Sequence, residues 1–305
     1  MVSYIIRRIL WAIPVLLVIS LITFSLAHAI PGGPFDREKK LPQEIIANLE
    51  AYYGLDDPLW KQYTDYLWNA LHGDLGPSYS SRSRTVNDII VEHFPVSAQL
   101  GVLAMIIAMM VGIPLGMVSA LKQNSYIDYF CMFFALLGVS VPAMTLGPIV
   151  VWFFALKLNI LPVARWGTWQ QAILPAFTLG IGSAALLARL TRASMLQVIR
   201  EDYIRTARSK GVSEKNVTIH HALKNALIPV VTVIGPLFAA LVTGSLVVEQ
   251  IFAIPGCGKY FITSVTNRDY PVILGIMLLY AVLIIVANLV VDLTYAWIDP
   301  RIKYS

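Results

Sequence analysis

Six long apolar runs without Lys, Arg, Asp or Glu divide the chain: 9–34, 95–121, 129–156, 167–188, 225–248 and 270–291. Each run is long enough for the ~20 residues that cross ~30 Å of hydrocarbon as a helix. One charge at the bilayer centre costs ~2.5–3.5 kcal/mol on insertion scales. The pattern therefore predicts an all-α integral membrane protein with six transmembrane helices, and it disfavours the buried helices of a large soluble protein.

Composition agrees with this prediction. The chain of 305 residues is 57% hydrophobic and only 13% charged, whereas soluble domains carry about 25% charged residues. The apolar stretch within residues 1–30 is too long for a signal peptide and lacks a small-residue cleavage site, so we expect a retained first helix. The two cysteines, Cys131 and Cys257, imply no disulfide framework.

Basic residues beside the spans predict the orientation. With both termini in the cytoplasm, the inner segments hold 13 Lys and Arg residues and the outer segments hold 10. Six of those outer ten lie in the long loop 35–94, which also carries ten acids, and long loops cross the membrane largely regardless of charge. The short segments therefore favour a multi-pass protein of the cell (inner) membrane with both termini cytoplasmic.

The outer loop, residues 35–94, has the pattern of a small helical unit. One helix is predicted after Pro42 with Gly54 as its stop, and a second after Asp57-Pro58 with Gly73 at its end. The apolar positions at helical spacing are Leu41, Ile45, Leu49 and Tyr52 in the first helix, and Trp60, Tyr63, Leu67 and Leu71 in the second. Two interpretations remain open: a cap packed on the outer membrane surface, or a docking platform for an extracytoplasmic partner.

Prolines and glycines recur in or near the spans. Gly112 and Gly116 have the GxxxG spacing that lets two helices approach closely. Prolines such as Pro114, Pro142 and Pro236 free backbone carbonyls and bend helices. Together these residues predict kinked helices around a cavity that opens and closes, although static membrane bundles also contain kinks.

The inner segment between the fourth and fifth spans, residues 189–229, is basic. We expect a helix up to Lys210, a break at Gly211, and a second helical run from about Glu214 to Leu223. Two helices joined by a glycine, lying parallel to the membrane, form a peg that another protein can grip. The alternative is a basic loop that only contacts anionic lipid and fixes topology.

Residues 203–211, YIRTARSKG, resemble the "EAA" loop of bacterial ABC importer permeases. Ala207 and Gly211 match its A-xxx-G core, Arg205 and Thr206 depart from the family's Glu and Ala, and Pro229 matches the distal proline. HALKNALIP at 221–229 and GSLVVEQIFAIPGCGKYFITSVTNRDYP at 244–271 resemble the peptide and nickel branch. LPQEIIANLEAYYGLDDPLWKQY at 41–63 is similar to B-type oligopeptide permeases, and the resemblance covers nearly the whole chain.

The resemblance implies the type I ABC importer permease fold, divided into an N-terminal transmembrane helix (1–34), an extracytoplasmic helical loop (35–94), a permease domain (95–294) and a cytoplasmic tail (295–305). It implies a coupling loop at 193–224 that sits in a cleft of a cytoplasmic ATPase and moves when ATP binding closes the ATPase pair. The residues assigned to coupling on this ground are Tyr203, Arg205, Thr206, Ala207, Arg208, Lys210, Gly211, His221, Asn225 and Pro229.

The implied partners are two ABC ATPase subunits, a second homologous permease, an extracytoplasmic solute-binding protein, membrane lipid and a peptide substrate. Oligopeptides are expected first and dipeptides next, and nickel or glycosides stay open within the branch. The chain is expected to be a non-catalytic transport subunit without a cofactor, a metal or a nucleic acid partner.

Other motifs are interpreted as chance matches. Gly256-Cys257-Gly258-Lys259 lacks the spacing and the Ser or Thr of a phosphate loop, and adjacent His220 and His221 point to different sides of a helix. Glu249 and Asp292 stand at span ends, where they are gate or pairing residues or, as we favour, interfacial charges in contact with water.

Two other classes of protein remain as alternatives. An intramembrane enzyme needs a nucleophile with a base, or a metal cluster, and the apolar runs contain neither paired acids nor histidine ligands. An ion-coupled carrier acting alone buries ionisable residues in mid-span. The lack of such charges in these runs favours energy supplied from outside the chain.

Overall fold

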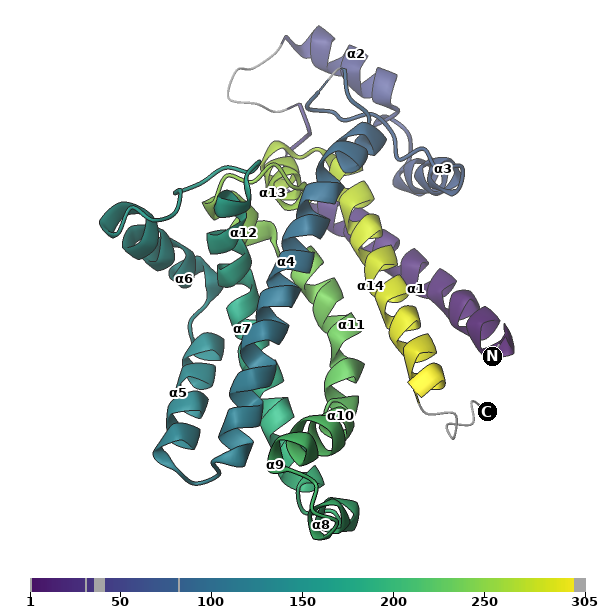
Figure 1. Cartoon of the computed structure of the whole chain (residues 1–305). Coiled ribbons are helices and arrows are strands. Elements are labelled where there is room, and N and C mark those ends of the chain that lie inside the picture. The colour runs from purple at the N-terminus through teal and green to yellow at the C-terminus, as the bar shows by residue number, and fades with distance from the viewer. Residues whose placement is uncertain (1, 31, 36–41, 82, 299–305) are drawn as a thin grey trace. The chain divides into compact units, whose positions relative to one another are not determined.

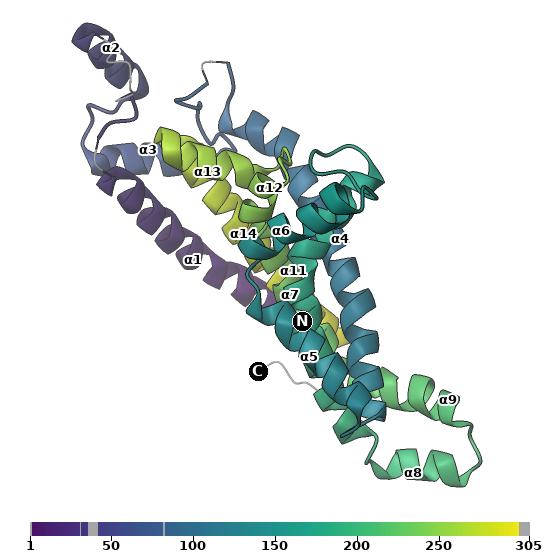
Figure 2. The ribbon, with the colours of Figure 1, turned by 90° about the vertical axis from the view of Figure 1, so that its left-hand side faces the viewer.

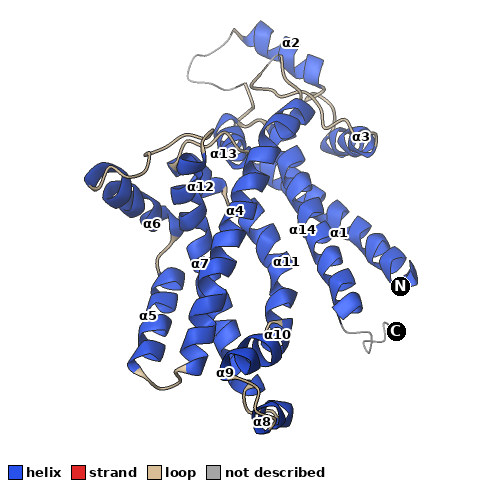
Figure 3. Ribbon diagram, in the orientation of Figure 1, coloured by secondary structure: helices blue, strands red, loops and turns tan. Residues whose placement is uncertain are grey.

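A computed structural model describes residues 2–30, 32–35, 42–81 and 83–298 of the chain. Within these ranges the fold is helical, and the β pairing is a single isolated bridge between Pro77 and Thr85 (Figures 1 and 3). The long helices are α1 (Val2–Ala29), α4 (Val86–Leu121), α7 (Trp169–Val198), α11 (Ile228–Thr243) and α14 (Tyr270–Ile298). The shorter ones are α2 (Gln43–Tyr53), α3 (Leu59–Leu71), α5 (Tyr126–Ser140), α6 (Ala143–Val150), η1 (Val151–Lys157), α8 (Asp202–Ser209), α9 (Glu214–Asn216), η2 (Val217–Leu223), α10 (Lys224–Ala226), α12 (Leu246–Ile251) and α13 (Cys257–Asn267).

Five predicted spans are single apolar stretches of helix, at Ile5–Ala29, Val86–Leu121, Trp169–Val198, Ile228–Ile251 and Tyr270–Leu293. The third apolar run, 129–156, differs, because Tyr126–Ser140 and Ala143–Lys157 meet at an angle of 108°. Pro142 is the cause: Val141 before it is extended (φ −94°, ψ 113°), as a residue preceding proline prefers, and Pro142 begins α6. The pair gives the sixth span when both halves are counted together.

The described residues form two compact units. The first contains the chain up to Pro95 together with Gly256–Val286, and the second contains Val96–Pro255 together with the end of the described chain from Ala287. Both α4 and α14 contribute to each unit. The units are described one at a time below.

The core of the second unit depends on glycines. A Cβ at Gly112 or Gly116 of α4 would collide with the carbonyl oxygen of Ala184 or Ala188 on α7. A Cβ at Gly180 of α7 would meet the backbone of Ala104 on α4 in the same way. The close approach predicted from the GxxxG spacing is therefore confirmed, and α4 and α7 pack backbone against backbone.

An ion pair braces the second unit where α4, α5 and α7 come together. The Asp128 carboxylate, 3% exposed, accepts hydrogen bonds from Arg192 Nε at 2.8 Å and Nη2 at 2.7 Å. It also accepts from the Ser119 hydroxyl and from the backbone N–H of Asn124. The carboxylate is thus fully partnered, as a buried charge requires.

In the first unit, the two helices predicted for the outer loop are confirmed as α2 and α3. The predicted stops are also confirmed, since Gly54 and Gly73 have φ of +67° and +81°. The loop that follows is tied to the start of α14 by the Asp269 carboxylate. It accepts from the Ser78 hydroxyl at 2.5 Å and from the N–H groups of Tyr79 and Ser80 at 3.1 and 3.0 Å.

The contact between α4 and α7 predicts different outcomes for two glycines on one helix. We expect Gly180→Ala to destabilise the protein by about 1–3 kcal/mol, because the new methyl group must push α4 away. Gly182→Ala is the matched control, since its Cβ would lie 3.5 Å from the Gly138 carbonyl oxygen, an ordinary contact. Denaturant titration in mixed micelles measures both. Equal unfolding free energies for the two variants would contradict the close packing.

Candidate functional site

The inner segment forms a helix–turn–helix platform made of α8, the turn at Gly211, α9 and η2 (Figure 2). The helix predicted to continue to Lys210 does not do so: α7 ends at Val198 and α8 begins at Asp202. Glu201 between them is extended (φ −68°, ψ 148°), and Asp202 places a negative charge in the first turn of α8, where the helix dipole favours it. The bend turns the apolar residues of α8 back toward the bundle.

Apolar residues anchor the platform to the long helices. Ile204 is fully buried and Ala207 is 8% exposed. They belong to a cluster with Ala120 at the end of α4, Met195 near the end of α7 and Ala226 of α10. α8 is therefore packed against the ends of several long helices at once.

The turn requires a left-handed backbone at Gly211, where φ is +78°. The Gly211 N–H donates to the Arg208 carbonyl at 2.9 Å, and the Val212 N–H donates to the Ala207 carbonyl at 3.3 Å. A Cβ at Gly211 would have no heavy atom within 4 Å. Glycine is therefore favoured here because of the backbone conformation of the turn. Any side chain placed there would project outward.

Two side-chain contacts hold the platform in shape. Arg208 donates from Nε to Glu214 Oε1 at 2.8 Å and from Nη2 to Oε2 at 3.3 Å, across the turn. Asn225 Nδ2 donates to the Tyr203 hydroxyl at 2.7 Å and to the His221 carbonyl at 3.1 Å. Arg208 thus already has an acidic partner inside the chain, whereas Lys210 and Lys215 are exposed.

The structure brings most of the predicted coupling residues to this platform. Tyr203, Arg205, Thr206, Lys210, Gly211, His221 and Asn225 are exposed on it. Ala207 is buried beneath it, and Pro229 instead stands at the start of α11. Sequence reasoning missed Ile204, which anchors α8, and Glu214, which pairs with Arg208 across the turn. The spacing of Ile204 and Ala207 among charged residues was the signal that could have found the anchor.

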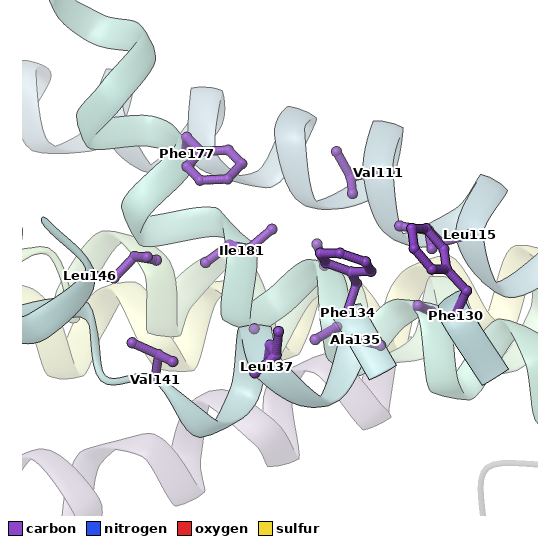
Figure 4. Close-up of a pocket in the computed structure, with 14 residues that line it drawn as sticks. Val111, Leu115, Phe130, Phe134, Ala135, Leu137, Val141, Leu146, Phe177 and Ile181 are labelled. Carbon is purple, nitrogen blue, oxygen red and sulfur yellow. The ribbon is translucent and has the colours of Figure 1, made fainter. Parts of the chain in front are cut away.

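A separate apolar cavity of about 500 Å³ lies in the second unit between α4, α5, α6 and α7 (Figure 4). Phe130 and Phe134 of α5, Val111 and Leu115 of α4, and Ile181 of α7 are among its lining residues. These side chains offer dispersion contacts and no hydrogen-bonding group. The cavity therefore lacks the groups that would recognise a polar solute.

The interpretation of Glu249 as a charge in contact with water is wrong. Its side chain is fully buried at α12. It accepts hydrogen bonds from the Ser97 hydroxyl at 2.7 Å and the Ser245 hydroxyl at 2.5 Å. Ser97 of α4 and Ser245, the residue that caps α12, thus both donate to Oε1 of this buried carboxylate, as a buried polar group requires. Asp292 of α14 is half-buried.

The other motifs form no second site. Gly256 begins α13, Cys257 is buried beside it, and His220 and His221 are exposed on η2. Among the residues that the structure describes, there is no cluster of three His, Cys, Asp or Glu side chains that could hold a metal ion.

Several helices long and apolar enough to cross a membrane indicate a multi-pass membrane protein. Residues 112–304 match the family model described as binding-protein-dependent transport system inner membrane component. Residues 1–101 match the model of the N-terminal part of such membrane components. The chain belongs to the family of binding-protein-dependent transport system inner membrane components.

Relatives along the full length support this assignment. The chain is 46% identical to the dipeptide transport system permease protein DppB of Bacillus subtilis over 304 residues, 99% of this chain and 98% of that protein. It is 43% identical to the oligopeptide transport system permease protein OppB of Salmonella typhimurium over 306 residues, 100% of each chain. The resemblance to ABC importer permeases is confirmed, and the protein is a permease subunit, a non-catalytic membrane component.

A solved structure confirms the fold. The inward-facing MetNI methionine ABC transporter aligns with a TM-score of 0.57 and 16% identity, over 69% of this chain and 96% of that chain. At this identity the likeness shows the fold alone, which agrees with the type I importer permease fold predicted from the sequence.

The anchor predicts a local effect on the platform. We expect Ile204→Ala to destabilise the docking of α8 by about 2–5 kcal/mol, because it leaves a cavity at a fully buried position. Ile219→Ala is the matched control, since Ile219 lies on the same platform and is 41% exposed. Hydrogen exchange of the α8 amides in the purified protein is the measurement. It should accelerate for Ile204→Ala alone, and equal exchange in the two variants would contradict the anchor.

Proposed function

We propose that this permease is one of two membrane-spanning subunits of an ATP-driven importer of peptides. Its full-length identity of 43–46% to permeases named for dipeptide and oligopeptide transport carries the proposal. The second subunit would be a homologous permease, and an extracytoplasmic binding protein would deliver the peptide. Two cytoplasmic ATPase subunits would supply the energy.

The platform supplies the mechanical link in this proposal. Its exposed face, centred on the Gly211 turn, would seat in a cleft of one ATPase subunit, and ATP binding would draw the two ATPase subunits together. Because Ile204 and Ala207 fix α8 to the ends of α4, α7 and α10, the motion would reach the spans as rigid-body switching between inward-facing and outward-facing states.

The proposal requires the platform and both termini to lie in the cytoplasm. The excess of Lys and Arg in the short inner segments supports this orientation. In this arrangement 1–34 is the first transmembrane helix, 35–94 the extracytoplasmic loop, 95–294 the permease domain with its coupling loop at 193–224, and 295–305 the cytoplasmic tail.

Oligopeptides are the first candidate for the cargo and dipeptides the second, since relatives of both kinds match along the whole chain. The test is uptake of labelled peptides of graded length in a strain that lacks this permease, with and without the restored gene. Restoration of peptide uptake is the expected result. Uptake restored only for nickel or glycosides would overturn the peptide assignment, and uptake that persists without the ATPase subunits would overturn the ABC mechanism.

The Gly211 turn predicts an uncoupled variant. We expect Gly211→Asp to insert into the membrane at the normal level, because an added Cβ meets no heavy atom within 4 Å and aspartate tolerates positive φ better than most residues. The carboxylate would project into the interface with the ATPase, so peptide uptake should be lost while ATP hydrolysis by the complex continues.

Gly73→Asp is the matched control for this variant. Gly73 also has a positive φ and open space around its Cβ position, but it follows α3 in the outer loop. Uptake and ATP hydrolysis should stay coupled in this control. Normal uptake by the Gly211→Asp protein would contradict the proposal that the platform couples ATP hydrolysis to uptake.

A further inference from the structure

Helix α3 exposes a stripe of large apolar side chains. None of its residues is fully buried, and Trp60, Trp68 and Leu71 are 70%, 65% and 82% exposed. A soluble surface rarely carries two tryptophans and a leucine side by side. We therefore expect either lipid or another protein to cover this stripe.

Hydrogen bonds to α1 show which side of α3 faces the middle of that helix. The Tyr63 hydroxyl donates to the Leu17 carbonyl at 3.2 Å and shares a hydrogen bond of 2.9 Å with the Ser20 hydroxyl. Ser20 lies nine residues before the end of α1 at Ala29, which is about 14 Å along the helix axis. The Tyr63 side of α3 thus faces the middle of the apolar span of α1.

The neighbouring residue, Gln62, marks the opposite direction. Its Oε1 lies 3.3 Å from His28 Nε2, at the outer end of α1. Its Nε2 donates to the carbonyls of Leu55 and Asp57 in the loop before α3, at 3.0 and 2.7 Å. The Gln62 side therefore faces the end of α1 and the loop before α3.

Helical spacing sorts the other side chains between these two directions. Trp60, Leu67 and Leu71 stand three before, four after and eight after Tyr63, so they share its side. Asp65 and Asn69 stand three and seven after Gln62 and share the other side. Trp68 and Lys61 are seven residues apart and lie together at the border between the two sides. The hydrogen bond of Lys61 with Asp57 raises the pKa of its ammonium group. The apolar stripe thus faces the depth of the span, and the polar side faces outward.

We propose that α3 is an interfacial helix that lies in the outer boundary between lipid head groups and acyl chains, with Trp60, Trp68 and Leu71 inserted into lipid. An amphipathic helix with tryptophans on its apolar side is the form that binds this layer, and the indole ring prefers the membrane–water interface. For α3, the occupant is lipid and not a docked protein. The inference is independent of the cargo and of ATP coupling.

The test places spin labels on the two sides of α3 in the full-length protein, assembled with its partner subunits in vesicles of phosphatidylethanolamine and phosphatidylglycerol. Trp60→Cys and Leu71→Cys sample the apolar stripe, and Asp65→Cys and Asn69→Cys sample the polar side. Collision rates with oxygen, which partitions into lipid, and with a neutral nickel chelate, which stays in water, are compared. Both native cysteines are buried, so the wild-type protein measures background labelling.

We expect the ratio of oxygen to nickel collisions to be several-fold higher at positions 60 and 71 than at 65 and 69. Similar ratios at all four positions with free access of the nickel chelate would place the stripe in water and overturn the proposal. Exclusion of both reagents at 60 and 71 would show that protein covers the stripe, which also overturns it. The thermal unfolding midpoint of each labelled variant should match that of the wild type, since all four side chains are exposed.

Discussion

The backbone contact between α4 and α7 is the constraint on which the rest of the second unit depends. In hydrocarbon, apolar side chains gain little by leaving lipid for protein, so association rests on van der Waals contact at close range. The two backbones come this close because no side chain stands between them at Gly112, Gly116 and Gly180. The Asp128–Arg192 pair joins α5 to α7, and the Ser119 hydroxyl links α4 to the same carboxylate. α7 therefore ends at a defined place and direction, which is where the platform begins.

Shape, more than charge, defines the platform. The buried Ile204, the left-handed backbone at Gly211 and the Arg208–Glu214 clasp are all satisfied within the chain. A platform whose conformation is already fixed loses little conformational freedom when a partner binds it. The exposed ion pair itself contributes little to stability, so its effect is to favour one geometry of the turn. Lys210 and Lys215 remain as exposed charges for a partner's acids.

The sequence predicted those features that depend on local physics. Span positions follow from the cost of charge in lipid, and the ends of α2 and α3 follow from the positive φ that Gly54 and Gly73 adopt. The platform's turn was predicted on the same ground. Features that depend on distant residues were not predictable. Asp128 and Arg192 are 64 positions apart, and Glu249 finds Ser97 from another helix. Pro142 signalled a break, but the angle of 108° depends on packing around it.

The positions of Glu249 and Tyr63 are explained by the same constraint on polar atoms in an apolar layer. Glu249 is buried, and two serine hydroxyls satisfy its carboxylate, so it can stay inside the bundle without contact with water. Tyr63 reaches the span of α1 from outside because its hydroxyl finds the Leu17 carbonyl and Ser20, while its ring stays among apolar atoms. In both cases the polar atom enters an apolar layer only with its hydrogen bonds already made. Lys61, Asp65 and Asn69 have no such partners within the spans, so α3 must keep them toward water. Its orientation at the membrane surface is a consequence of that requirement.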